Sequence, residues 1–181
     1  MLNYHEIIDK YYESGSPLRE ILILHSKQVA DKAKSLCRSS NLQLSEEDIE
    51  AAAMLHDIGI CRTHAPKIHC HGDAPYIQHG IIGANMLRVE GCPEWLARVC
   101  ERHTGAGLTV DDIRTQRLPL PEKDYLPEST IEKLICYADK FFSKSGDMAE
   151  KSYDEVYRSM LSHGADTLKR FEQLHDLFAN E

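Results

Sequence analysis

The stretch Leu55-His56-Asp57-Ile58-Gly59 decides how this chain is interpreted. An apolar run over residues 49–54 leads into a histidine and an aspartate side by side, and the glycine that follows is expected to stop the helix. Histidine and aspartate together are ligands for a transition metal or a hard divalent cation. One His-Asp pair is a weak signal by itself. Its significance depends on whether other polar side chains fall on the apolar faces of the predicted helices.

The length and composition are those of an ordinary globular protein. Its 181 residues fit one domain, and 42% apolar with 28% charged residues are average values. The net charge of −8 argues against a nucleic acid polymer as partner, because phosphate backbones are held by an excess of Lys and Arg. A small nucleotide in a pocket stays compatible with that charge. No stretch approaches the ~20 apolar residues of a membrane span, so no membrane partner is expected.

Six cysteines occur without any C-x-x-C pair, and the N-terminus lacks the basic start and apolar core of a signal peptide. Free thiols in a reducing compartment are the expected state. We therefore predict a cytoplasmic protein.

Apolar spacing predicts helices along most of the chain. They are expected over residues 2–13, from 17 to about 37, from 46 to the stop at 59, from 76 to about 90, from 93 to about 103, over 131–142, and twice more in the tail. Residues 60–74 and 105–128 are expected to be loops, and the second is long enough to be functional. The sequence shows no β-strand run of note and no internal repeat. The predicted fold class is therefore all-α, a single-domain helical bundle over residues 1–181.

Six polar side chains fall on the apolar faces of these helices. A lone histidine there is usually a core residue with a hydrogen-bond partner. Two inward-facing aspartates are harder to explain, because a buried carboxylate is costly unless it is paired or binds a metal. Helix bundles build metal sites from inward side chains on facing helices. The predicted metal ligands are His25, His56, Asp57, His79, His103 and Asp139.

The order of these residues, together with the His56-Asp57-Ile58-Gly59 motif, resembles the HD-domain superfamily of metal-dependent phosphohydrolases over about residues 18–145. The resemblance implies an HD-type helical core, with helices over 147–179 packing on it. It also implies that His25, His56, Asp57 and Asp139 bind one metal.

His79 and His103 match positions that hold a second metal in dinuclear members, where the residue matching Asp57 bridges both ions. This pattern resembles the diadenosine tetraphosphate hydrolase and cyclic-di-GMP phosphodiesterase branches, but the Gly-Tyr-Pro motif of the latter is missing, so that activity is set aside. The stretches 102–107 and 137–140 resemble an uncharacterised HDIG subgroup that indicates no substrate.

Two cations about 4 Å apart can share a hydroxide and polarise a phosphoryl oxygen. The ligand types favour two ions of iron or manganese per chain, with zinc, nickel and magnesium left open. Asp57 and Lys140 are the expected catalytic residues. Further phosphate contacts are assigned to Arg62, Lys67 and Arg102. Ile60 stands where many HDIG proteins carry a lysine, so one phosphate contact is expected from elsewhere.

The preferred function is hydrolysis of a small phosphate ester, with a nucleotide or dinucleotide as substrate. A di-iron oxygenase acting on a small polyol or phosphonate is the alternative, since some members of the superfamily use the same ligands for oxygen. A non-enzymatic sensor is disfavoured by the complete ligand set. His64, His69 and His71 are interpreted as exposed loop histidines, with an outer pocket wall or a separate metal site left open. The tail helices allow core or homodimer packing.

Overall fold

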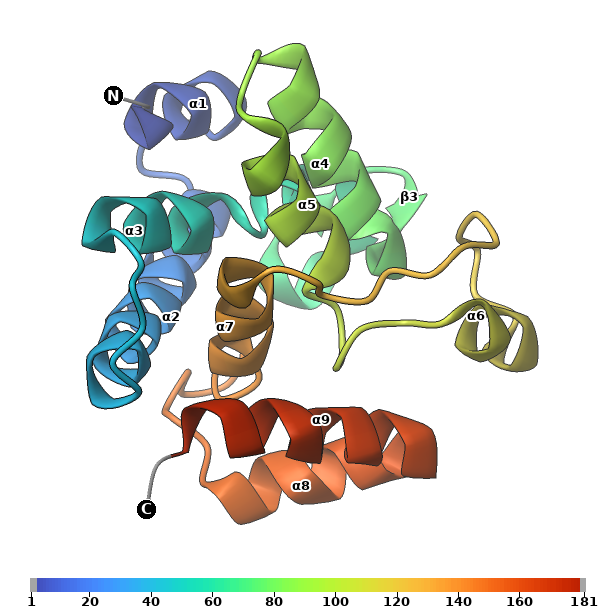
Figure 1. Cartoon of the computed structure of the whole chain (residues 1–181). Coiled ribbons are helices and arrows are strands. Elements are labelled where there is room, and N and C mark those ends of the chain that lie inside the picture. Colours follow the sequence, from blue (N-terminus) through green and yellow to red (C-terminus); the bar gives the residue numbers. More distant parts are fainter. Residues whose placement is uncertain (1–2, 180–181) are drawn as a thin grey trace.

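The computed structural model describes residues 3–179, and the all-α prediction is confirmed (Figure 1). Residues 1–2 and 180–181 of the predicted domain lie outside the described part. The α-helices are α1 (Tyr4–Tyr11), α2 (Pro17–Ser39), α3 (Glu46–Leu55), α4 (His79–Val89), α5 (Glu94–Arg102), α6 (Val110–Gln116), α7 (Thr130–Asp139), α8 (Tyr153–Ser162) and α9 (Ala165–Phe178).

Serine hydroxyls begin several of these helices. Ser16 accepts a hydrogen bond from the backbone N–H of Arg19, and proline follows it at the first helical position. Ser45 and Ser129 cap α3 and α7 in the same way. Such a cap satisfies backbone donors that have no partner inside the helix.

The core lies where α2, α3, α5 and α7 meet. Leu22, Val29, Ile49, Leu96 and Leu134 are fully buried there. α7 lies next to both α2 and α9, and on its α9 side the ring of Tyr137 stacks on Phe171 at 5.6 Å. Because α7 is enclosed in this way, its last residue, Asp139, ends inside the molecule.

Residues 60–74 were expected to be a loop and form compact short elements instead. A 3-10 helix η1 (Ile58–Arg62) leads into β1 (Thr63–Ala65), η2 (Pro66–Ile68), β2 (Cys70–His71), β3 (Ala74–Pro75) and η3 (Tyr76–Gln78). The strand order is β2-β1-β3, with β2 antiparallel and β3 parallel to β1. The sequence shows no strand run of note, and these strands of two or three residues are too short for alternation to reveal them.

The segment 105–128 also contains structure that the sequence reading missed. Its helix α6 begins with a reciprocal capping box between Thr109 and Asp112, a T-x-x-D signal that could have revealed it. Backbone hydrogen bonds between Leu108 and Tyr125 join the two ends of the segment. Leu108, Ile113 and Tyr125 form a small hydrophobic cluster of their own, against Ile77 and Ile81. We call residues 105–128 the α6 lobe.

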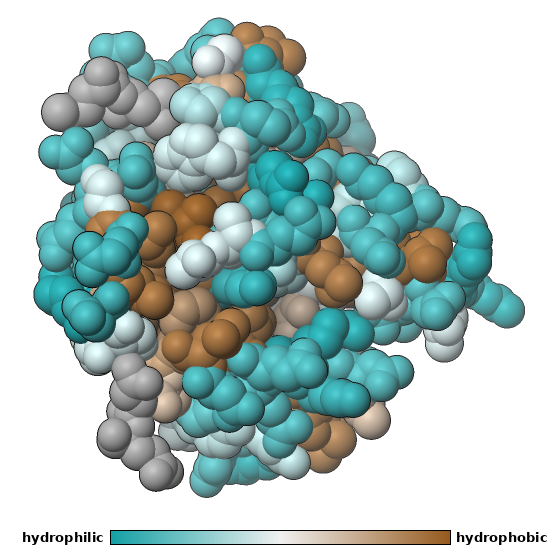
Figure 2. Space-filling model, viewed as in Figure 1, coloured by the Kyte–Doolittle hydropathy of each residue, from teal (hydrophilic) through white to brown (hydrophobic). Residues whose placement is uncertain are grey.

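Hydrophilic side chains predominate on the face shown in Figure 2, and hydrophobic ones gather between α3 and α7. Within residues 3–179, no helix is both long and apolar enough to cross a bilayer. The six cysteines are free thiols, as expected.

Candidate metal centre

His25 comes from the middle of α2, one helical turn from Leu22 and Val29, and its side chain is fully buried. Its Nε2 lies 2.9 Å from Asp139 Oδ1 and 3.2 Å from Asp57 Oδ2. The apolar spacing of α2 therefore carries His25 into contact with both aspartates.

The other three histidines lie at helix ends rather than on helix faces. His56 and His103 follow the last residues of α3 and α5, and His79 follows η3 as the first residue of α4. Each Nδ1 contacts the carbonyl three residues earlier, at 2.6 Å for His56, 2.7 Å for His79 and 2.7 Å for His103. Carbonyls in the last turn of an α-helix lack an intrahelical donor, so the imidazoles of His56 and His103 supply one, whereas the carbonyl of Tyr76 also accepts from the backbone N–H of His79. Hydrophobic spacing found these residues but placed them inside the helices.

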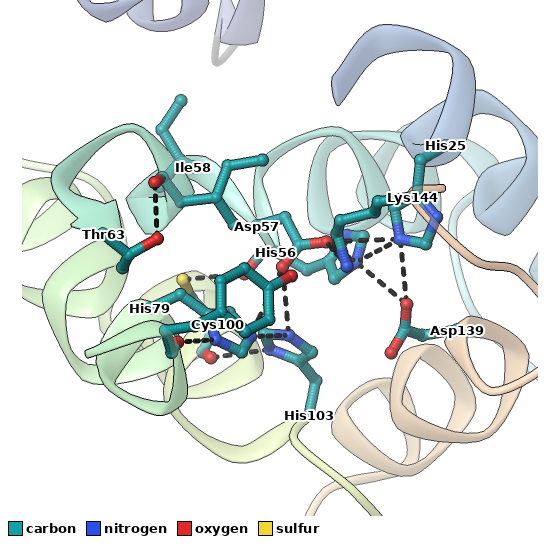
Figure 3. A network of polar contacts seen from close by, with 12 residues as sticks. His25, His56, Asp57, Ile58, Thr63, His79, Cys100, His103, Asp139 and Lys144 are labelled. Carbon is teal, nitrogen blue, oxygen red and sulfur yellow. Dashed lines mark hydrogen bonds and ion pairs between the residues drawn. The ribbon is translucent and has the colours of Figure 1, made fainter. Parts of the chain in front are cut away.

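Asp57 divides the four histidines into two pairs (Figure 3). Its Oδ2 lies 3.2 Å from His25 Nε2 and 3.0 Å from His56 Nε2, and the two nitrogens are 3.3 Å apart. Its Oδ1 lies 3.5 Å from His79 Nε2 and 3.4 Å from His103 Nε2, and those nitrogens are 3.0 Å apart. Asp139 Oδ1 completes the first group, at 3.4 Å from His56 Nε2. The carboxylate thus touches both groups, as a bridging ligand would.

The hydrogen bonds of the histidines test whether a cation fits. A carbonyl oxygen only accepts, so Nδ1 of His79 and of His103 must each carry the proton. Their Nε2 atoms then present lone pairs to each other and to Asp57 Oδ1, which has no hydrogen-bond donor within the described residues. Buried acceptors that face one another without a donor are unfavourable, and a cation between them removes the conflict. The buried groups therefore fit divalent metal binding.

The electrostatics of the two groups differ. Burial lowers the pKa of His79 to about 3 and also lowers the pKa of His103, so both rings are neutral at pH 7. Burial opposes a charge on His56 as well, but the neighbouring Asp57 and Asp139 outweigh it and raise the pKa of His56 to about 9. Burial would raise the pKa of Asp57, yet His56 and Lys144 hold it well below its usual range. The first group thus favours an added positive charge, whereas the second keeps its two histidines neutral, the form in which an imidazole can bind a metal.

Two lysines contact the aspartates from the segment after α7. Lys140 Nζ lies 2.7 Å from Asp139 Oδ2 and donates to the carbonyl oxygen of His103 at 3.0 Å. Lys144 Nζ lies 2.6 Å from Asp57 Oδ2. The sequence pattern predicts a role for Lys140 but not for Lys144, which lies beyond the last motif in an irregular segment.

A model of the HD domain matches residues 22–143, a range that contains the six predicted ligands and Lys140 and ends one residue before Lys144. The chain belongs to the HD-domain family. The resemblance inferred from the sequence is therefore confirmed.

Similar sequences occur in a protein covered over most of its length and as part of longer enzymes. An uncharacterised protein of Methanocaldococcus jannaschii is 30% identical over 164 residues, covering 89% of each chain. A tRNA (cytidine(56)-2'-O)-methyltransferase of Picrophilus torridus is 34% identical over 71% of this chain but only 33% of its own length. The enzyme of the same name from Thermoplasma volcanium is 30% identical over 93% of this chain and 44% of its own length. The chain thus spans less than half of these methyltransferases. No solved structure matches.

The three arginine and lysine residues expected at the substrate do not join the ligands. Arg62 and Lys67 are exposed, and the Arg62 guanidinium lies over the ring of Tyr11 at 6.0 Å. Arg102 contacts the segment just before α7. Its Nη1 lies 2.7 Å from Glu128 Oε1 and donates to the carbonyl oxygen of Leu126 at 3.1 Å. Their substrate role stays a prediction, and the geometry brings Lys140 and Lys144 closer to the HD-domain ligands.

The three loop histidines are exposed, as the preferred interpretation expects. His64 and His71 face each other in register on β1 and β2, and His69 follows η2 in a left-handed conformation. Within the described residues, the groups able to hold a metal are the two around Asp57.

Proposed function

We propose that this HD-domain protein is a metal-dependent phosphohydrolase that cleaves a small phosphate ester, with a nucleotide as substrate. The observation that carries the proposal is the Asp57 carboxylate, whose oxygens each approach one pair of histidines. A carboxylate so placed can hold two cations side by side.

The ligand sets are His25, His56, Asp57 and Asp139 for one ion, and Asp57, His79 and His103 for the other. Imidazole with carboxylate suits iron, manganese or zinc, and iron or manganese is our preference. Such a pair of ions supplies Lewis acidity and an activated water for attack on phosphorus. The second set has fewer protein ligands, which leaves room there for water or substrate.

The chain's own residues fix this arrangement. The carbonyls of Ala53, Tyr76 and Cys100 hold three imidazoles in the tautomer that directs Nε2 inward. Lys140 ties Asp139 to the carbonyl of His103, so one ammonium group positions ligands of both sets.

Two observations bear on the choice of substrate. The net charge of −8 disfavours a long phosphate backbone. The relatives named as tRNA methyltransferases contain a similar domain, and their name refers to a cytidine, which favours a nucleotide-related substrate over other phosphate esters.

The test is metal analysis of the purified protein, followed by a phosphomonoester and phosphodiester panel with Mn²⁺ or Fe²⁺. The panel includes 5'- and 2'-phosphorylated nucleosides and dinucleoside polyphosphates. We expect release of phosphate or nucleotide that depends on metal. Turnover that requires oxygen and a mixed-valent iron pair would replace this proposal with the oxygenase alternative.

A further inference from the structure

Lys144 enters the metal centre from segment 140–152, which joins α7 to α8 without a regular helix (Figure 3). Its ammonium reaches Asp57 Oδ2, which is also the Asp57 oxygen that contacts His25 and His56. The Lys144 side chain is 13% exposed, whereas that of Asp57 is fully buried. Lys144 therefore approaches the carboxylate from the solvent side and covers it.

The two lysines beside the centre have different partners. Lys140 bridges Asp139 and the backbone carbonyl of His103, and the carbonyl contact holds it in place whether or not a metal binds Asp139. Lys144 instead neutralises Asp57, the carboxylate that both metal groups share. A cation bound to Asp57 takes over that neutralising role and repels the ammonium.

Released from Asp57, Lys144 would still be tethered beside the centre. Tyr76 is close to it, and the Tyr76 ring stacks on that of His79 at 4.8 Å. Ile60, at the position where the family often has a lysine, is fully buried and offers no charge. Lys144 is then the cation best placed to meet an anionic substrate above the metals.

We propose that Lys144 is a phosphate-binding residue that pairs with Asp57 in the metal-free protein and, once metal occupies Asp57, binds a non-bridging oxygen of the substrate's phosphoryl group. This inference rests on the proposed function for the identity of the anion. It makes phosphate binding depend on metal loading, because a metal on Asp57 releases the ammonium of Lys144 from that carboxylate.

The first test follows the amine of Lys144 in the unaltered protein. Lysine acetylation by a water-soluble ester is mapped by mass spectrometry in three states, namely metal-free, Mn²⁺-loaded, and Mn²⁺-loaded with inorganic phosphate. We expect Lys144 to be protected, then reactive, then protected again. Lys27, exposed on the α2 helix that carries His25, should react equally in all three. Lys144 that stays protected on metal loading would overturn the proposal.

The second test measures binding of Mn²⁺ and of inorganic phosphate by calorimetry for Lys144→Gln, with Lys27→Gln as the matched loss of charge. Lys144→Gln should bind Mn²⁺ more tightly, since it lacks the competing ammonium. Its Mn²⁺-loaded form should bind phosphate about tenfold more weakly, as expected for loss of a charge-assisted hydrogen bond. Lys144→Arg keeps the charge and should retain phosphate binding.

The outcomes separate the two proposals. Unchanged phosphate affinity in Lys144→Gln, or a joint loss of Mn²⁺ and phosphate, would show that Lys144 only supports the ligands, and would overturn this inference. If phosphate binding follows the expected pattern while no ester in the panel is cleaved, the proposed hydrolysis fails and the anion site stands.

Discussion

Asp57 is the residue on which both halves of the centre depend. Its two oxygens lie within 3.5 Å of all four histidine Nε2 atoms. A backbone turn makes this reach possible, since Asp57 lies between the end of α3 and the start of η1 with φ −107° and ψ 12°. Its side chain therefore leaves the helix direction and points between the histidine pairs.

Asp57→Ala should abolish both metal binding and turnover while leaving the helix content unchanged. The loss follows because each ligand group contains this carboxylate. Mass spectrometry measures the metal content, and far-UV circular dichroism measures the helix content. Asp73→Ala, which removes an exposed aspartate from the neighbouring turn, serves as control. Full metal content in Asp57→Ala would refute the bridging role.

Replacing both His79 and His103 by alanine should reduce occupancy from about two ions to about one, because the remaining four residues form a complete mononuclear set. The paired control replaces His64 and His71, which are exposed on the small sheet. That control should keep both ions. If the two double variants bind equal amounts of metal, the second ion does not lie at His79 and His103.

At the scale of elements, close approach between η1 and α4 positions the second histidine pair. Gly59 was expected to end a helix, but α3 already ends at Leu55, and Gly59 lies inside η1. A Cβ added at Gly59 would lie 2.2 Å from the carbonyl oxygen of His79 and 2.5 Å from the backbone N of Gly83. Glycine is needed here for contact between backbones rather than for an unusual dihedral angle.

Gly59→Ala should therefore displace the start of α4 and weaken the second metal site. Overpacking of this kind costs about 1–3 kcal/mol of unfolding free energy. For a chain of this size the melting temperature would fall by roughly 2–12 °C. Gly91→Ala, at φ +72° with open space around it, strains the backbone but should keep the metal content. Equal metal affinity in both variants would contradict the role given to Gly59.

The α6 lobe is joined to the rest of the fold by few elements. Arg170 on α9 pairs with Asp112 at 2.6 Å and donates to the carbonyl oxygen of Gly107 at 3.3 Å. The lobe follows His103 directly and precedes the helix that ends in Asp139. The start of the lobe is therefore two residues from the ligand His103.

Shortening the lobe between Leu108 and Tyr125, which already pair by backbone hydrogen bonds, should change substrate preference more than metal content. The measurement compares kcat/KM across the ester panel with the metal content of the same preparation. Arg170→Ala provides a milder change, because it loosens the lobe without removing it. Unchanged kinetics on every substrate would reduce the lobe to a connection.

At the scale of the whole molecule, the metal centre joins α2, α4, α5 and α7 with the turn after α3. Removing the metal should therefore destabilise the fold and not only stop the reaction. A ligand at a hundred times its Kd stabilises the native state by about 2.7 kcal/mol. For this length, that corresponds to roughly 5–11 °C in melting temperature per site.

Calorimetric melting with and without a chelator checks this expectation. Adding Mn²⁺ back should restore the higher melting temperature in the unaltered protein and in Asp73→Ala, but not in Asp57→Ala. Identical melting temperatures with and without chelator would mean that the buried groups do not hold a metal.

Local patterns in the sequence were enough to predict the longer helices and the six histidines and aspartates that the structure gathers around Asp57. The spacing of apolar residues around His25 and Ile49 marks inward faces, and motif order identified the family. The strands of the small sheet and α6 were missed because they are too short for their periodicity to show. Among the proposed phosphate contacts, Arg62 and Arg102 have partners elsewhere, on Tyr11 and Glu128.

The sequence by itself determined the helical class, the family and the set of histidines and aspartates, since these follow from residue types and their spacing along the chain. Only the tertiary structure decided that Asp57 faces both histidine pairs, that Gly59 lets η1 approach α4, and that Lys144 covers the carboxylate. These contacts join residues far apart in the sequence. Their geometry depends on how helix ends and irregular segments pack, which no local period encodes.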